Sequence, residues 1–423
     1  MSTTSATRRA TLFRHPDFRR LWVGDTVSQF GTQLTVLALP VLAVRVLGAD
    51  ELQMGLLGTF EFLAFLVIGL PAGAWVDRWP KKRVLVTGDL VRAVALGSLP
   101  LAWALGVLGF GQLLVVALVT GVCTVFFDVA YQSYLPDLVE PEDIGQGNAK
   151  LQASQSVAMI GGPALAGGLV RLVGAPLTIA FDAVSFVVSA AFVGRIRHVD
   201  TPPPAAGRRP IVEEVREGLS FVLRDPLLWR IAASTSTNNF FSSMTGAMLV
   251  IFVLEDLGLS PGQMGLALGI GAAGGLLGAL VTPRINRLVG EGRTIPLSVL
   301  LCVPAGIFLP LAGPVFPPMV ALVASSLLLT FSVVVYNVTQ VSFRQRLCPR
   351  PLLGRMNASI RFLVWGVMPI GSLVGGLLGQ AYGARAVFWV GLVGTALAAL
   401  PVLFSPLIGM RDLPRELDRL SGA

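Results

Sequence analysis

Residues 53–76 read QMGLLGTFEFLAFLVIGLPAGAWV, residues 77–83 read DRWPKKR, and residues 84–107 read VLVTGDLVRAVALGSLPLAWALGV. Two long apolar runs therefore flank one short, strongly basic loop. A helix that crosses the hydrocarbon core of a bilayer, about 30 Å thick, needs about 20 mainly apolar residues. Each run meets that length, so this stretch predicts two membrane-spanning helices joined by a charged turn.

The composition of the whole chain supports this interpretation. Hydrophobic residues make up 54% of the 423 residues and charged residues only 13%, whereas soluble domains carry about 25% charged residues. This deficit excludes a soluble enzyme, a disordered chain and a nucleic-acid-binding protein, despite the net charge of +8. The three cysteines form no CxxC pair, and His15 and His198 lie in charged flanking segments, so we expect no metal site and no cofactor.

Twelve apolar runs follow one another along the chain, and a long polar interval at 196–226 divides them six and six. Their approximate cores are 21–46, 53–76, 84–107, 110–133, 151–173, 176–195, 227–254, 263–288, 294–312, 317–342, 354–380 and 385–408. We therefore expect an all-α integral membrane protein with twelve transmembrane helices in two pseudo-symmetric six-helix bundles. The expected domains are an N-terminal bundle at 1–197, a cytoplasmic linker with a short amphipathic helix at 198–225, a C-terminal bundle at 226–410 and a cytoplasmic tail at 411–423.

The positions of Lys and Arg predict the orientation in the membrane. If the N-terminus is cytoplasmic, 29 of the 32 basic residues fall in cytoplasmic segments, which leaves Arg45, Arg171 and Arg385 outside. An excess of basic residues on the cytoplasmic side is the usual pattern of membrane proteins. We therefore expect both termini in the cytoplasm, and the positive charge reflects orientation rather than an acidic partner.

The two halves also repeat a short pattern. Pro136 and Asn148 precede a glycine-rich span in the first half, and Pro349 and Asn357 do so in the second, 213 and 209 residues later. Two related bundles with a substrate site between them are the usual plan of secondary transporters.

The loop between the second and third spans carries the most specific motif. Gly73-Ala-Trp-Val-Asp77-Arg78-Trp-Pro-Lys81-Lys82-Arg83 resembles the signature loop of the major facilitator superfamily, with Pro80 in place of the usual glycine. The resemblance covers essentially the whole chain and implies the major facilitator fold. It also implies a cytoplasmic gate in which the residue matching Asp77 lies against the N-terminus of span 11, where the helix dipole favours a carboxylate by about 0.3–1 kcal/mol. The implied gate residues are Gly73, Asp77, Arg78, Lys81 and Lys82. Asp89 and Arg92, one turn apart at the start of span 3, are expected to extend this charge network. The alternative is that residues 77–92 only anchor the topology.

Span 5 carries a second likeness. Gly162, Pro163, Gly167 and Gly168 resemble the Gly-Pro element of antiporter members of the superfamily. Phe18-Arg19-Arg20-Leu-Trp22 and Phe181-Asp182-Ala-Val-Ser185-Phe186 further resemble an exporter branch that includes macrolide-efflux and siderophore-export proteins. Span 4 departs from the drug-antiporter pattern because it contains no arginine.

Five carboxylates fall within the spans, and all of them are in the first half: Asp25, Glu61, Asp89, Asp128 and Asp182. An ionised side chain at the bilayer centre costs about 2.5–3.5 kcal/mol, so each is a functional candidate. The candidates for proton coupling are Glu61, Asp25, Asp128 and Asp182, and Glu61 leads because it lies near the middle of its span. The alternative for each is a structural hydrogen bond to a neighbouring helix.

Uncharged polar and aromatic residues are candidates for the wall of a substrate cavity. They are Gln29, Gln33, Asn238, Asn239, Phe240, Tyr336, Asn337, Gln340 and Trp365. A pocket of aromatics with few polar groups suits an amphipathic ligand, although interhelical bonds and lipid-facing rings explain many of these residues equally well.

The favoured function is secondary active transport: proton-coupled efflux of an amphipathic small molecule, such as a drug, antibiotic or siderophore, by rocker-switch alternating access. The alternatives are an uptake symporter or lipid flippase of the same fold, an integral-membrane enzyme, which the lack of clustered catalytic residues disfavours, or a non-transporting membrane sensor. The expected partners are a small-molecule substrate, protons and the lipid bilayer, with no nucleic acid. We expect a monomer in the plasma membrane, and the abundance of Arg, Ala and Gly favours a bacterial inner membrane.

Overall fold

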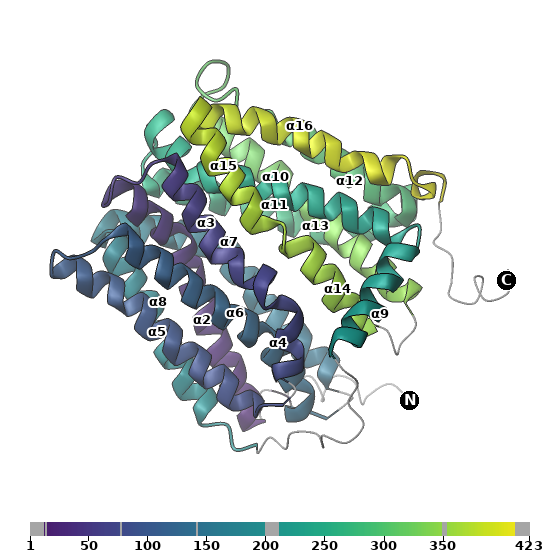
Figure 1. Cartoon of the computed structure of the whole chain (residues 1–423), viewed down its shortest axis with the longest axis horizontal. Helices are drawn as coiled ribbons and strands as arrows, with labels where there is room; N and C mark the ends of the chain where they lie inside the picture. The colour runs from purple at the N-terminus through teal and green to yellow at the C-terminus, as the bar shows by residue number, and fades with distance from the viewer. Residues whose placement is uncertain are drawn as a thin grey trace, which may run out of the picture. The chain divides into compact units, whose positions relative to one another are not determined.

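The computed structural model of the chain describes residue 12 and residues 15–76, 78–140, 143–198, 211–348 and 353–410. Helices account for nearly all of these residues, and no β-strand occurs among them. The helices form two compact units (Figure 1). Unit 1 comprises residues 1–47 and 71–208, and unit 2 comprises residues 48–70 and 209–423.

In the part of the chain that the structure describes, unit 1 is built from five long helices, which pack against one another, and most of the short helix α4. They are α2 (Pro16–Arg45), most of α4 (Gly69–Val76), α5 (Lys81–Ala104), α6 (Phe110–Leu138), α7 (Ile144–Val173) and α8 (Ala175–Gly194). Helix α2 packs on α7 and α8, and α5 packs on α6 and α8. Asp17 links the start of α2 to the segment that follows α8. Its carboxylate accepts hydrogen bonds from the backbone N–H groups of Arg197 and His198, each at 3.1 Å.

Unit 2 contains the second half of the chain together with one helix from the first. Its elements are α3 (Glu51–Val67), α9 (Ile211–Arg224), α10 (Leu228–Ile251), the π-helical turn η2 (Phe252–Asp256), α11 (Pro261–Val289), α12 (Glu291–Gly306), α13 (Pro318–Leu347), α14 (Leu353–Trp365), α15 (Met368–Tyr382), α16 (Ala384–Leu403) and the 3₁₀ turn η4 (Pro406–Gly409). Helix α9 occupies the stretch where the sequence predicts an amphipathic helix. Its Val222 is buried in the core of this unit with Met356 and Ile360.

Ten helices among the described residues have the length and composition of membrane spans. The expected spans at 53–76 and 294–312 are the two that are not among these ten. The first is divided into α3 and α4, because Pro71 has no N–H to donate to the carbonyl of Val67. The second ends early, at Gly306, where the Ile307 N–H donates to the Pro304 carbonyl instead of continuing the α-helical pattern.

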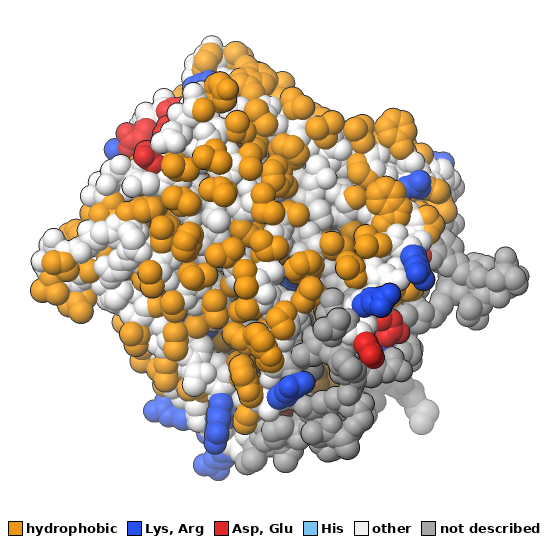
Figure 2. Space-filling view, in the orientation of Figure 1, with side chains coloured by type: hydrophobic (Ala, Val, Ile, Leu, Met, Phe, Trp, Pro, Cys, Tyr) orange, Lys and Arg blue, Asp and Glu red, His pale blue; other side chains and the backbone are white. Residues whose placement is uncertain are grey.

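The surface matches a membrane environment. Hydrophobic side chains dominate the face drawn in Figure 2, and Lys and Arg side chains lie near its margins. Large apolar residues such as Leu172, Leu288 and Phe404 are strongly exposed. Soluble monomers rarely expose apolar surface over so wide an area, so this surface fits a chain surrounded by lipid.

Within unit 2, α3 packs on α15 through glycines that let the two backbones touch. A Cβ atom added at Gly376 would lie 2.8 Å from the Cα atom of Gly55 and 3.0 Å from the carbonyl oxygen of Glu51. Real Cβ atoms do not approach backbone atoms this closely, so no larger residue fits without moving a helix. In lipid, small residues at such contacts hold helices together through van der Waals packing.

Gly376→Val is therefore expected to lower the thermal unfolding midpoint of the purified protein, by an overpacking cost of about 1–3 kcal/mol. The matched control is Gly246→Val on α10, where an added Cβ meets nothing within 4 Å. Tryptophan fluorescence during heating in detergent measures both midpoints. Equal midpoints for the two variants would show that the α3–α15 contact is not tight.

Candidate functional site

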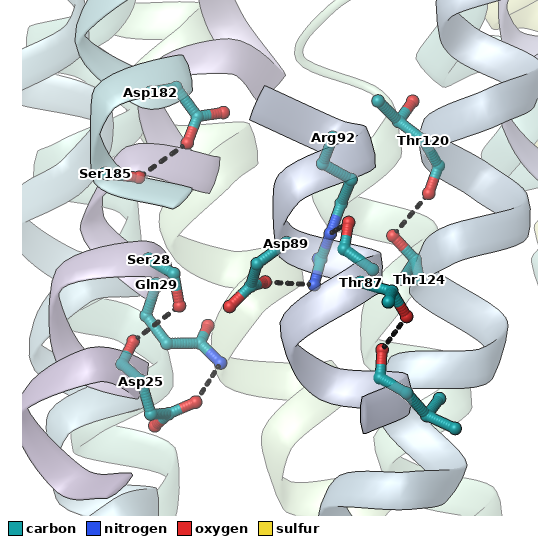
Figure 3. A network of polar contacts seen from close by, with 12 residues as sticks. Asp25, Ser28, Gln29, Thr87, Asp89, Arg92, Thr120, Thr124, Asp182 and Ser185 are labelled. Atoms are coloured by element: carbon teal, nitrogen blue, oxygen red, sulfur yellow. Dashed lines mark hydrogen bonds and ion pairs between the residues drawn. The ribbon is translucent and has the colours of Figure 1, made fainter. Parts of the chain in front are cut away.

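Three carboxylates are buried inside unit 1, on three different helices. Asp25 of α2 is 2% exposed, Asp89 of α5 is 0% exposed and Asp182 of α8 is 1% exposed. Figure 3 shows them facing the same interior region of the bundle. Each lies in a helix with the length and composition of a membrane span, where an ionised carboxylate is costly.

Arg92 is the cation of this region. It lies one turn after Asp89 on α5, and its Nη2 atom donates to Asp89 Oδ1 at 2.7 Å. Its guanidinium carbon lies 4.4 Å from the ring centre of Phe127 and 4.3 Å from that of Phe186. The planar guanidinium therefore contacts one ring from α6 and one from α8, a geometry in which the cation is attracted to both ring faces.

Hydroxyl groups surround Asp182. Thr35 Oγ1 donates to Asp182 Oδ2, and Ser185 Oγ donates to Oδ1 at 3.0 Å. The close approach of α2 and α8 depends on Gly31, because a Cβ atom there would overlap both Ser185 Oγ and Asp182 Oδ1. Arg92 and Asp89 are near enough to act on Asp182 electrostatically.

Asp25 is the third buried carboxylate, and it interacts with residues of α6. Gln29 Nε2 donates to Asp25 Oδ1 at 3.4 Å, and Ser28 Oγ donates to the Asp25 backbone carbonyl at 3.0 Å. Asp89, Asp128 and the hydroxyl of Tyr131 interact with Asp25 electrostatically. We call Asp25, Asp89, Arg92 and Asp182 the buried acidic network.

The charges of this network do not balance. It holds three carboxylates, and Arg92 is the one Lys or Arg that is buried in the part of the chain that the structure describes. In addition, Asp89 Oδ2 has no hydrogen-bond partner among the residues that the structure describes. A buried ion without a partner costs several kcal/mol, and such groups take up a proton instead. The network therefore holds more carboxylates than one arginine can neutralise.

The leading sequence candidate, Glu61, lies elsewhere. It belongs to α3 in unit 2, ten residues from the helix start, or about 15 Å along the helix axis. Its side chain is exposed, and no hydrogen bond or ion pair links it to the described residues. The structure thus joins two of the proton-coupling candidates, Asp25 and Asp182, and places Asp128 beside them.

The described residues of the expected cytoplasmic gate do not form one cluster. Asp77 lies outside the described residues, and Arg78 is exposed. Lys81 Nζ donates to Asp137 Oδ2 at 2.7 Å and to the Ser133 carbonyl at 2.9 Å, at the end of α6. Lys82 Nζ donates to the Ile196 carbonyl at 2.6 Å, just after α8. Gly73 is half-buried on α4 with open space where a Cβ would lie.

Asp89 and Arg92 therefore serve the buried acidic network rather than the loop. Arg92 is thus an intramembrane residue, whereas the sequence placed it at the cytoplasmic gate. The signal was present, because Asp89 and Arg92 are three residues apart inside the apolar run 84–107, on one face of a helix.

One glycine of the Gly-Pro element makes a close helix contact. A Cβ atom at Gly162 would overlap the side chain of Gln33, so α7 packs against α2 at this point. Pro163 lies inside α7, Gly167 is buried, and an added Cβ at Gly168 meets nothing within 4 Å. The structure thus places Gln33 at a helix interface.

A second polar region lies within unit 2. A cavity of about 50 Å³ lies among α10, α12 and α13. Its lining residues are Ser234, Thr235, Asn238, Asn239, Val299, Cys302, Val333, Tyr336 and Asn337. Four of the residues expected to line a substrate cavity, Asn238, Asn239, Tyr336 and Asn337, therefore come together here. Gln340 adjoins them, because its Nε2 donates to Asn337 Oδ1 at 3.4 Å.

The other aromatic candidates pack against neighbours in the same unit. Phe240 contacts Phe241 edge-on, with ring centres 5.1 Å apart. Trp365 packs on Phe65 of α3 at 4.8 Å. These rings lie outside the lining of the cavity. Gln29 belongs to unit 1, at the buried acidic network.

Beside the cavity, the helix expected at 354–380 is interrupted between α14 and α15. Polar side chains of α10 donate to carbonyl oxygens around the break: Ser236 to Leu363, Asn239 to Val364 and Ser243 to Met368, each at 3.0 Å. Backbone groups freed within a membrane must find partners inside the protein. Ser236 and Ser243 were not among the candidates from the sequence, although residues 234–239 read STSTNN and residues 242–243 read SS within an apolar run.

Comparison with known proteins identifies the family. Residues 21–370 match the sequence model of the Major Facilitator Superfamily. The multidrug efflux pump Tap of Mycobacterium tuberculosis is 26% identical over 406 residues, which cover 92% of this chain and 91% of that protein. Macrolide efflux protein A of Streptococcus pyogenes is 21% identical over 399 residues, which cover 94% and 97%. Among solved structures, the nucleoside transporter NupG shares the fold with a TM-score of 0.74 at 13% identity, over 92% of this chain and 98% of that one. The chain belongs to the Major Facilitator Superfamily, a family of multi-pass membrane transporters.

Proposed function

We propose that the protein exports amphipathic small molecules in exchange for protons, by alternating access in which its two units rock against each other. The full-length similarity to a multidrug efflux pump and a macrolide efflux protein supports the direction of transport and the class of substrate. The observation that carries the proposal is the buried acidic network, which has three carboxylates for one arginine.

The network supports proton coupling through its charge. If all three carboxylates were ionised, the interior of unit 1 would hold a net charge of about −2, which is prohibitively costly away from water. Binding of protons removes this charge, and their release on one side of the membrane restores it. Arg92 neutralises Asp89 directly, so Asp182 and Asp25 are the residues that exchange protons during transport.

The remaining elements of the proposal concern the arrangement in the cell. Both termini lie in the cytoplasm, as the distribution of Lys and Arg predicts, and the protein acts as a monomer in a bacterial inner membrane. Protease accessibility of an epitope at each terminus, in intact cells and in inside-out vesicles, tests the orientation. Cleavage in intact cells would overturn it.

Purified protein in liposomes tests the function. With erythromycin as the solute, vesicles with an acidic lumen are expected to accumulate the drug through molecules whose cytoplasmic side faces outward. Accumulation should stop when nigericin collapses the pH gradient. Protein-free vesicles control for pH trapping of this weak base. Accumulation that survives loss of the pH gradient, or that follows a sodium gradient instead, would overturn proton coupling.

A further inference from the structure

We propose that the cavity among α10, α12 and α13 is a binding subsite for a neutral, hydrogen-bonding group of the solute, such as a hydroxyl or an amide. This inference rests on the proposed transport function and names the substrate chemistry that one part of the protein recognises. The subsite lies wholly within unit 2, apart from the buried acidic network of unit 1.

The lining of the cavity is polar and uncharged. Hydroxyl and amide groups come from Ser234, Thr235, Asn238, Asn239, Tyr336 and Asn337, and the apolar part comes from Val299, Cys302 and Val333. No Asp, Glu, Lys or Arg belongs to this lining. A cation would be desolvated here with no carboxylate in the lining to pair with it, which is costly, and the charge of Arg344, which acts on Tyr336, disfavours it further. A neutral group with donors and acceptors finds partners, so the lining selects for it.

The side chains have hydrogen-bonding capacity left over. An asparagine amide has two donors and an acceptor with two lone pairs. Asn238 makes no hydrogen bond with the part of the chain that the structure describes. Asn239 donates to the Val364 carbonyl at 3.0 Å, and its Oδ1 atom has no partner within the same residues. Thr235 and Tyr336, in contrast, hydrogen-bond to each other at 2.6 Å. Asn238 and Asn239 are therefore the residues that hydrogen-bond to a ligand.

The size of the cavity limits what enters. A water molecule needs about 10–15 Å³ of such space, so 50 Å³ admits about three or four non-hydrogen atoms. That is the size of a hydroxymethyl or carboxamide group, not of a whole drug. The larger, apolar part of the solute remains outside, past Val333 and Asn337, which are the exposed residues of the lining.

Thiol labelling tests the subsite without measuring transport. The variant carries Val333→Cys in a background where Cys123, Cys302 and Cys348 are alanine. The matched control carries Val338→Cys in the same background, on the same helix but outside the lining; the native valines are 38% and 41% exposed. Labelling rates with N-ethylmaleimide are measured in detergent, with chloramphenicol as the neutral diol-amide probe and tetraphenylphosphonium as a cation without hydrogen-bonding groups.

Chloramphenicol is expected to slow labelling at position 333 at least fivefold and at position 338 less than twofold. Tetraphenylphosphonium should protect position 333 less than chloramphenicol does. Adding Asn238→Leu, which keeps the volume and removes the amide, should abolish the protection by chloramphenicol. Absence of protection at 333, equal protection at both positions, or protection that survives Asn238→Leu overturns the proposal.

The two proposals fail separately. Protection at 333 with no pH-driven accumulation of erythromycin in liposomes would keep the subsite and reject proton-coupled efflux. Accumulation of erythromycin without protection would keep efflux and reject the subsite. If the cysteine-free background does not fold, chloramphenicol binding by calorimetry to the wild type and to Asn238→Leu decides instead, and a loss of affinity of less than threefold overturns the subsite.

Discussion

Replacing Arg92 with methionine is expected to destabilise the protein by about 3–5 kcal/mol, the usual effect of removing one partner from a buried ion pair. Arg92 is 6% exposed and donates to Asp89 Oδ1 at 2.7 Å. Methionine retains contact with the rings of Phe127 and Phe186 but supplies no positive charge. Asp89 would then be a buried carboxylate with no cation beside it. Thermal unfolding of the purified protein in detergent, at neutral pH, measures the loss.

Two further variants separate charge from packing. Asp89→Asn combined with Arg92→Met removes both charges, so the double variant should recover most of the lost stability. Arg92→Lys keeps the charge but replaces the planar group that contacts two rings, so its stability should fall between those of the wild type and of Arg92→Met. A double variant no more stable than Arg92→Met would show that the Asp89–Arg92 pair is not what Arg92 stabilises.

Replacing Asp182 with asparagine is expected to lower pH-gradient-driven transport at least about tenfold, a factor that corresponds to about 1.4 kcal/mol. Asparagine fits the site of Asp182 and still hydrogen-bonds to the hydroxyls of Thr35 and Ser185, so folding and expression should be normal. It cannot take up and release a proton. Erythromycin accumulation in liposomes with an acidic lumen measures the loss, and counterflow exchange without a gradient should persist.

Glu61→Gln is the matched comparison, because Glu61 is exposed and lies in α3 of unit 2 rather than in the buried acidic network. We expect it to retain gradient-driven transport. If Glu61→Gln abolishes this transport while Asp182→Asn leaves it intact, the proton is carried by Glu61, the candidate that leads in the sequence. The same two variants thus decide between the two assignments.

The sequence predicted the family and the all-helical membrane fold, and the family match and the structural similarity confirm both. It was less accurate where proline interrupts an apolar run. Pro71 interrupts a helix within a stretch that hydropathy alone assigns to one continuous span. Hydropathy averages over a window of residues, whereas a missing N–H acts at one position, so composition does not locate such breaks.

The sequence identified many of the residues at the candidate sites but not which of them lie close together. The sequence identified Asp25 and Asp182 because carboxylates are conspicuous in apolar runs. It ranked Glu61 above them on depth in the membrane, since depth can be counted along a helix. Which residues approach one another cannot be counted in this way. Asn238 and Asn337 are far apart in the chain, and only the tertiary structure, which places α10, α12 and α13 around one cavity, brings them together.

The sequence by itself determined the helices and their membrane character. A backbone in lipid must satisfy its hydrogen bonds within each helix, and these bonds join residues that are close in the chain, so an apolar run is enough to predict a helix. The tertiary structure alone decided that the Asp89–Arg92 pair is buried among other helices. Arg92 meets Asp89 on its own helix, but its burial depends on Phe127 of α6 and Phe186 of α8. That environment is created by helix rotation and close packing at glycines such as Gly31, and these depend on contacts between segments distant in the chain.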